Sequence, residues 1–401
     1  MHFSHNIENR YSTFKKVIPT LVLYLFINGL FVLKYVGRTQ YSPVVALVLY
    51  IFAILLFFLS FKFLFRGASK KKLINSLIGL LSIISITIIL LLHHEINPDT
   101  LNIDRWSAIH YFIQNLFDGI YPYAAQTHLG GYGSPFPIWQ FFHIPFFLMG
   151  NISYAMIFSF LLFVIALMYY EENKEKKLFI ILLLTLSPSF WYEAAARSDL
   201  FYNFILVFIT ILIIANNKVS LQKNTLLLGA ICGLFMSTRI SVIIPFFIFL
   251  FPEFIKISVR KKLTFIGTIF LAFALSFLPL ILWDFHMLFL FEFNPFVLQS
   301  RQGNLFDVAF IIGISVFFSL RWQDNFFRLN EYIAFALFAF IAFTYLIKLI
   351  SSNFADNIFS SAYDITYFNM GMPFLIYSLA TAFLRNNEYS KDSKKAFLDK
   401  D

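Results

Sequence analysis

Residues 43–65, PVVALVLYIFAILLFFLSFKFLF, decide the fold class of this chain, because the whole stretch carries only one charge, at Lys62. A helix of about 20 apolar residues is long enough to cross the hydrocarbon core of a bilayer. A helix that is apolar on every side has no face to turn toward water. The stretch therefore predicts a transmembrane helix.

The composition of the chain also favours a membrane protein. Of its 401 residues, 59% are hydrophobic and 13% are charged, which is too little charge to cover a soluble protein of this length. The formal net charge is +9, but the basic residues form short clusters between apolar runs. This pattern is typical of cytoplasmic loops, so no nucleic-acid partner is expected. Cys232 is the only cysteine, so neither a disulfide nor a thiolate metal site is expected.

Twelve apolar runs predict an all-α polytopic membrane protein with about 12 transmembrane helices. The runs lie at 17–36, 43–65, 72–92, 152–170, 177–191, 200–215, 225–236, 241–255, 263–283, 306–320, 331–350 and 370–385. Splitting the chain at 237–239 leaves all but seven of the 31 lysines and arginines on the cytoplasmic side. The seven are Lys34, Arg38, Arg105, Arg197, Arg239, Arg301 and Lys348. A single span over 225–255 would instead place the basic cluster at 256–262 outside. Both termini are therefore predicted to be cytoplasmic, in the cell (inner) membrane.

This topology divides the chain into four parts. N-terminal transmembrane helices occupy 1–92, a long extracytoplasmic loop 93–151, a helical bundle 152–385 and a cytoplasmic tail 386–401. The loop contains no lysine, and its charges are four acids and one arginine. It is the one long loop on the predicted outer side and has a net charge of −3, which makes it the candidate location of a site.

Within the loop, residues 103–117 show the periodicity of an amphipathic helix, started by Asn102 and stopped by Gly119. Its apolar face consists of Trp106, Ile109, Phe112, Ile113, Leu116 and Phe117, and its opposite face of Asp104, Ala108, Tyr111, Asn115 and Asp118. Such a helix is expected to lie in the membrane interface, with Asp104 directed away from lipid. The simpler interpretation of Asp104 is an acid at the positive end of a helix dipole. Residues 138–149 predict a second interfacial or re-entrant helix.

Three motifs follow one another between about residues 90 and 255. They are Asp104 followed by Gly119-Ile120-Tyr121-Pro122-Tyr123, then Tyr132-Gly133-Ser134-Pro135-Phe136-Pro137, then Gly233-Leu234-Phe235-Met236-Ser237-Thr238-Arg239 followed by Pro245. In this order they resemble the GT-C superfamily of multi-span glycosyltransferases, which use polyprenyl-phosphate-linked sugars. The pattern is most similar to the bacterial mannosyltransferase-like branch.

The resemblance implies an inverting transfer of a hexose, with mannose as the first choice, on the outer face of the membrane. The expected partners are a polyprenyl-phosphate sugar donor, a glycan or glycolipid acceptor and membrane lipids, with no cofactor. Such a transfer needs a carboxylate to accept the proton of the attacking hydroxyl and a cation to hold the leaving phosphate. Asp104 is the candidate general base.

The candidate substrate-binding residues all lie on the predicted outer side. They are Arg105, Tyr123, His128, Arg197, Asp199, Arg239 and Arg301. Arginine binds phosphate through a two-pronged donor geometry, and Arg239 is the first choice because it sits at the predicted helix break. Arg197 and Asp199 are two residues apart, so mutual pairing is the simpler interpretation of these two. No metal site is predicted, since the adjacent His93 and His94 do not share a helix face.

Two other functional classes remain open. A polysaccharide polymerase or ligase would use a late outer loop, and the segment 284–305 contains the polar residues Asp284, His286, Glu292 and Arg301. A transporter of lipid-linked saccharides would need charges near the middle of the bilayer and two related halves, and no repeat is visible in the sequence.

Overall fold

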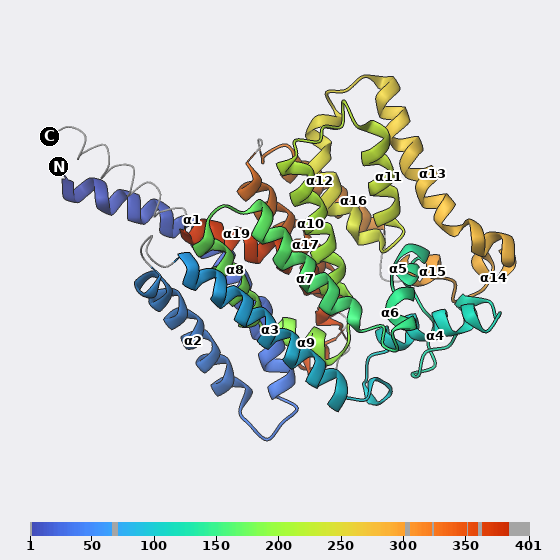
Figure 1. Ribbon diagram of the computed structural model, residues 1–401, viewed down its shortest axis with the longest axis horizontal. Coiled ribbons are helices and arrows are strands. Elements are labelled where there is room, and N and C mark those ends of the chain that lie inside the picture. Colours follow the sequence, from blue (N-terminus) through green and yellow to red (C-terminus); the bar gives the residue numbers. More distant parts are fainter. Residues whose placement is uncertain are drawn as a thin grey trace.

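The computed structural model describes residues 2–65, 71–300, 305–322, 325–350, 352–359 and 363–384 (Figure 1). Within these ranges, the named elements of secondary structure are all helices. Arg301 and the predicted tail at 386–401 lie outside the described residues.

Six helical stretches are long and apolar enough to cross a membrane. They are Val17–Val36 within α1 (His2–Val36), α2 (Pro43–Leu64), α3 (Lys71–Glu95), α13 (Val259–Trp283), α17 (Phe326–Ile350), and η5 (Ile365–Gly371) together with α19 (Met372–Leu384). A seventh is formed if α8 (Lys174–Thr185) and α9 (Pro188–Ala195), which meet at a bend of 58°, count as one span. These helices indicate a multi-pass membrane protein.

The remaining predicted runs form shorter apolar helices of 10 to 17 residues. They are α7 (Tyr154–Tyr170), α10 (Leu200–Asn216), α11 (Thr225–Met236), η4 (Ile240–Val242) with α12 (Ile243–Phe254), and α16 (Leu305–Ser319). Since a full crossing takes about 20 residues, twelve crossings stay a prediction. The predicted break at 237–239 is confirmed, because α11 ends at Met236 and η4 begins at Ile240.

Burial separates a central group of helices from a peripheral group. The apolar window of η5 and α19 is 89% buried, and it packs on α17, α1, α8 and α10. The window in α2 is only 17% buried, with Leu59 and Phe63 almost fully exposed. An apolar surface of this extent would promote aggregation in water, whereas lipid accommodates it because the backbone hydrogen bonds of a helix are satisfied internally.

The loop after α3 folds into short helices at one end of the bundle, on the right of Figure 1. They are α4 (Arg105–Phe117), η3 (Pro122–Ala124), α5 (Pro137–Phe142) and α6 (Ile144–Leu148), and α14 (Phe285–Phe289) and α15 (Pro295–Ser300) lie beside them. Gln299 donates a hydrogen bond to the carbonyl of Ser134 at 2.9 Å, and Tyr132 stacks on Phe293. The two loops predicted to share one side of the membrane therefore contact each other.

Helix α4 differs from its prediction in two respects. It begins at Arg105, so Asp104 rather than Asn102 occupies the N-cap position. Its apolar residues Ile109, Phe112 and Ile113 are buried, and Phe112 contacts the ring of Tyr123. Much of its apolar face is thus covered by protein, which periodicity cannot distinguish from cover by lipid. The predicted helix at 138–149 forms as two short ones, α5 and α6, which meet at His143.

The predicted orientation gives a direct labelling experiment. A single cysteine at Gln126, in the long loop, and one at Glu175, at the start of α8, are expected to react with a membrane-impermeant maleimide from opposite sides. The positive-inside distribution of lysine and arginine is the reason. The background is Cys232→Ser, which removes the buried native thiol. Labelling of both positions from the same side would refute the topology.

Candidate active site

Asp104 is held by the loop that follows α4 rather than by the helix it precedes. Its side chain makes no capping hydrogen bond, and its Oδ2 instead accepts a hydrogen bond from the Thr127 hydroxyl at 3.0 Å. The amide of Gly131 donates to the same hydroxyl at 3.0 Å. A Cβ on Gly131 would approach Asp104 Oδ2 to 3.1 Å, so a side chain at this position would crowd the carboxylate. The Asp104 side chain therefore does not serve as a helix cap, and it is half-buried.

The next residue, Arg105, enters a buried ionic cluster centred on Asp199. Asp199 is fully buried, at the N-terminus of α10, and its Oδ2 accepts hydrogen bonds from Arg239 at 2.5 Å and from the Trp139 indole at 2.6 Å. Arg105 Nη1 lies 3.6 Å from Asp199 Oδ1, while Arg105 Nη2 donates to Asp364 at 2.6 Å and to Thr366 at 2.9 Å. We call Arg105, Asp199 and Arg239 the Asp199 cluster.

The break between α11 and η4 brings Arg239 into this cluster. The break leaves carbonyls without helical partners, and the N-terminal end of α5 supplies donors for two of them. The amides of Phe136 and Ile138 donate to the carbonyls of Thr238 and Ser237, at 3.3 and 3.1 Å. A hydrogen-bonded break is stable inside an apolar bundle, because its polar groups are satisfied by protein. The sequence offers no neighbouring partner for Arg239, and in the folded chain its partner is Asp199.

Helices α11 and α13 are in close contact just before the break. A Cβ on Gly233 would lie 2.4 Å from the carbonyl oxygen of Ile269, and one on Gly229 would lie 2.8 Å from Thr268. Two glycines four residues apart let helix backbones approach closely in a membrane. The Ser237 hydroxyl then meets that of Ser276 at 2.5 Å. The small residues of the third sequence motif therefore have a packing role.

The Asp199 cluster has hydrogen-bonding capacity left over. Within the described residues, Arg105 Nη1, Arg239 Nε and Asp199 Oδ1 are buried and make no hydrogen bond. The 3.6 Å separation of Arg105 and Asp199 is an ion pair but is too long for a hydrogen bond. Burying such groups unsatisfied is costly, and the two guanidinium N–H groups could donate to an oxyanion, whereas Asp199 Oδ1 can only accept.

The pKa of Asp199 indicates that this residue does not act as a general base. Burial by itself raises the pKa of Asp199, but Arg239 and Arg105 outweigh it and hold that pKa below its usual range. A general base works best with a pKa near the working pH, so a carboxylate fixed in its ionised form by two arginines is poorly suited. Asp199 therefore positions the two guanidinium groups, and Asp104 is the better candidate to accept a proton.

Further polar groups that sequence analysis did not select surround the cluster. The Arg105 guanidinium lies over the ring of Tyr367, 5.3 Å from its centroid. Glu193 is fully buried and accepts a hydrogen bond from the amide of Asn369 at 2.9 Å. Lys34 is 3% exposed and is attracted by Asp364. Asp364, Tyr367 and Asn369 all come from the segment 363–369, which is distant from Arg105 in the sequence. Only a motif rich in Asp or Tyr could have marked this segment as part of a site.

The other candidate binding residues fall outside this cluster. Tyr123 is buried and donates its hydroxyl to the Pro135 carbonyl at 2.8 Å, so it packs the loop. His128 uses both ring nitrogens, with Ser107 at 2.7 Å and the Leu101 carbonyl at 2.8 Å. Both residues therefore hold the loop together. Arg301 lies outside the described residues.

Pairing of Arg197 with Asp199 was the simpler interpretation and is wrong. Arg197 donates to the carbonyls of His93 at 2.5 Å and Ile96 at 2.8 Å, at the end of α3. Asp199 turns the other way, toward Arg239. Residues two apart diverge here because Arg197 has a φ of 50° and reverses the chain between α9 and α10.

His143 is a neutral imidazole beside the cluster. Its Nδ1 lies 2.7 Å from the Trp139 carbonyl and its Nε2 lies 2.7 Å from the Tyr202 hydroxyl. A carbonyl only accepts, so the proton is on Nδ1 and Nε2 accepts from Tyr202. Burial lowers the pKa of His143 from 6.5 to about 4. The side chain thus orients Trp139, which in turn contacts Asp199.

We expect the stability of the protein to fall as the pH drops from about 6.5 toward 4. The unfolded chain binds a proton at His143 in this window and the folded protein does not, so acid favours unfolding, by on the order of 3 kcal/mol when complete. His143→Gln should flatten the dependence of the melting temperature on pH, measured in detergent. His286→Gln, at an exposed histidine, is the control and should leave the dependence unchanged. Equal slopes in wild type and His143→Gln would contradict the assignment.

Among the described residues, no group of three or more His, Cys, Asp or Glu side chains is arranged so that it could hold a metal ion. The polar residues of 284–305 do not form a second cluster among the described residues either. Asp284 caps α14 by accepting from the amide of Met287 at 3.0 Å, and His286 is exposed. The Asp199 cluster is thus the principal polar centre of the loop-bearing end.

Comparison with known proteins leaves the family open: no family model, no curated protein and no solved structure matches this chain.

Proposed function

We propose that this chain is a GT-C-type membrane glycosyltransferase of the cell (inner) membrane. It transfers a hexose, with mannose as the first choice, from a polyprenyl-phosphate donor to a lipid-linked or glycan acceptor on the outer face. In this proposal the helices cross the membrane twelve times and both termini are cytoplasmic. The observation that carries it is the adjacency of Asp104 to the Asp199 cluster, which puts an acid and two buried arginines at one end of the bundle.

Asp104 and the two arginines have different roles in the proposed reaction. The acceptor hydroxyl oxygen forms a bond to the anomeric carbon while the bond from that carbon to the phosphate oxygen breaks. Asp104 accepts the hydroxyl proton, and the electron pair leaves with polyprenyl phosphate. Arg239 and Arg105 stabilise the growing charge on that phosphate through their free N–H groups. Attack from the face opposite the leaving group inverts the anomeric centre.

The sequence adjacency of Asp104 and Arg105 supports this division. Consecutive Cα atoms are about 3.8 Å apart, and the two side chains diverge toward different partners. Asp104 reaches Thr127 in the loop, while Arg105 reaches Asp364 and the Asp199 cluster. In this proposal a donor with its phosphate on the arginines extends its sugar toward the Asp104 carboxylate.

The activity is tested with the purified chain in proteoliposomes. Polyprenyl-phosphate mannose and glucose, labelled in the sugar, are supplied with an extract of membrane glycolipids as acceptor. Transfer is expected to release polyprenyl phosphate in equal amount to the labelled product, with an inverted anomeric configuration by NMR. Movement of intact donor across the vesicle without release would indicate a transporter. Use of an oligosaccharide donor alone would indicate a polymerase or ligase.

A further inference from the structure

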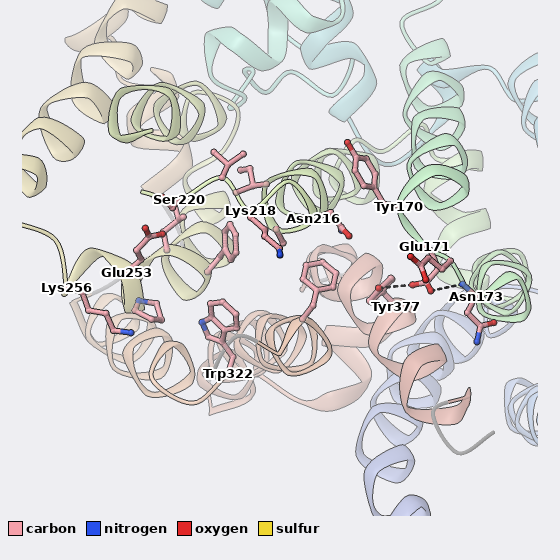
Figure 2. Close-up of a pocket in the computed structure, with 18 residues that line it drawn as sticks. Tyr170, Glu171, Asn173, Asn216, Lys218, Ser220, Glu253, Lys256, Trp322 and Tyr377 are labelled. Carbon is pink, nitrogen blue, oxygen red and sulfur yellow. Dashed lines mark hydrogen bonds between the residues drawn. The ribbon is translucent and has the colours of Figure 1, made fainter. Parts of the chain in front are cut away.

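A polar cavity lies at the opposite end of α10 from Asp199. Its volume is about 1110 Å³, and it is lined by the connections α7–α8 and α10–α11, the end of α12, the approach to α17, and α19 (Figure 2). Helix α10 has 17 residues, so about 25 Å separates the cavity from the Asp199 cluster. The cavity is therefore a separate site, and no step of the proposed transfer uses it.

The lining combines an aromatic wall with charges of both signs. Phe249, Trp322 and Phe326 supply the aromatic part. Lysines 218 and 256 and glutamates 171, 172 and 253 supply the charges. Glu171 is already neutralised inside the protein, because it accepts from Lys176 at 2.6 Å and from Tyr377 at 2.9 Å. Glu253 uses one oxygen for the amide of Gln222.

Lys218 occupies a backbone position that normally belongs to glycine. Its φ is 50°, and it follows the C-cap of α10, where the amide of Val219 donates back to the carbonyl of Ile214 at 3.0 Å. This is the glycine position of a Schellman motif, and a side chain there is strained. A strained residue that persists is a reason to look for a function.

Arg197 provides a comparison within the same chain. It too has a φ of 50° after a helix, α9, with the amide of Ser198 donating back to Glu193. Its guanidinium binds two main-chain carbonyls, which explains why a side chain is kept there. The side chain of Lys218 makes no hydrogen bond or ion pair with any described residue, and Figure 2 shows its ammonium directed into the cavity.

We propose that this cavity binds the headgroup of a zwitterionic phospholipid that carries a primary amine. Lys218 binds the phosphate, the Glu172 carboxylate and the remaining oxygen of Glu253 bind the ammonium, and the aromatic wall contacts the start of the acyl chains. The cavity lies where apolar helices end, at the depth of lipid headgroups. Lysines 218 and 256 balance glutamates 172 and 253 in charge, and this balance matches a zwitterionic headgroup better than a purely anionic lipid or a nucleotide.

Lipid retention tests the proposal without any transfer reaction. The protein is reconstituted in nanodiscs of phosphatidylcholine with equal parts phosphatidylethanolamine and phosphatidylglycerol. It is then re-extracted in mild detergent, and the retained lipids are counted by native mass spectrometry. Wild type should retain phosphatidylethanolamine preferentially. Lys218→Met should lose about fivefold or more of it, because a charged hydrogen bond is removed. Lys223→Met, which removes a lysine from the same connection outside the cavity, should retain it.

Lys218→Gly separates ligand binding from folding. Glycine relieves the backbone strain, so the melting temperature of lipid-free protein should hold or rise while retention falls. A lysine with only a structural role would lower both. Equal retention of phosphatidylethanolamine by wild type and both Lys218 variants would overturn the proposal. Equal retention of phosphatidylglycerol and phosphatidylethanolamine by wild type would also overturn it, since the glutamates would then select nothing.

Discussion

Replacing Asp104 with asparagine is expected to lower the rate of sugar transfer at least about a hundredfold, which is the lower end of the contribution of a positioned general base. Asparagine has nearly the same shape and can still accept the hydrogen bond from Thr127, so the loop should keep its structure. It cannot accept the proton of the attacking hydroxyl. The effect should appear in kcat for labelled donor in proteoliposomes, with the KM for donor little changed.

The control for this variant lies at the other end of the same helix. Asp118 is the exposed C-cap residue of α4, and Asp118→Asn removes the same charge without touching the site. Its kcat should remain within about twofold of wild type, as expected for an exposed surface change. If Asp104→Asn turned over donor as fast as Asp118→Asn, Asp104 would have no part in the mechanism.

Removing the guanidinium of Arg239 is expected to weaken donor binding more than any other single change in the cluster. Arg239→Ala should raise the apparent KM for donor about ten- to a hundredfold, the worth of a charged hydrogen bond to phosphate. Arg239→Lys keeps the charge but loses the two-pronged geometry, so its KM should rise less. Asp199 stays partly compensated in both variants, since Arg105 and Trp139 still contact it. Abundance should therefore fall only moderately.

Arg197 is the matched control, because it is an equally buried arginine at the same end of the bundle. Arg197 is 9% exposed and Arg239 is 7% exposed, but Arg197 binds main-chain carbonyls instead of the cluster. Arg197→Ala should lower the melting temperature and leave the donor KM unchanged. An unchanged KM and kcat in Arg239→Ala, at normal abundance, would return Arg239 to a structural role.

Apolar runs were sufficient to predict the class of this protein and the positions of its helices. Hydrophobicity over about 20 residues is a local property, so α2, α3 and α13 could be read directly from the chain. The break at 237–239 could also be predicted from the sequence, because a cation in the middle of an apolar run is costly to bury in a continuous helix. The length of 138–149 predicted a helix too short to span, but not its division into α5 and α6.

What the sequence could not decide was which polar residues meet. Asp199 was expected to pair with Arg197, its neighbour, yet it pairs with Arg239, 40 residues away. Asp364 and Lys34 received no role at all, although one binds Arg105 and the other lies near it in the folded chain. Ion pairs depend on distances of a few ångströms, and only the packing of α10, α11, α4 and η5 against one another sets those distances.

The sequence by itself therefore determined the membrane-protein class, the main helices, the long acidic loop and the choice of Asp104 and Arg239 as candidates. The tertiary structure decided that Asp104 is held by Thr127 rather than by a helix cap, and that Tyr123 and His128 pack the loop. It also brought Arg105, Asp199 and Arg239 together. The physical reason is that hydrophobic periodicity is encoded within one segment, whereas a buried charge cluster is assembled from several segments and exists only once they pack.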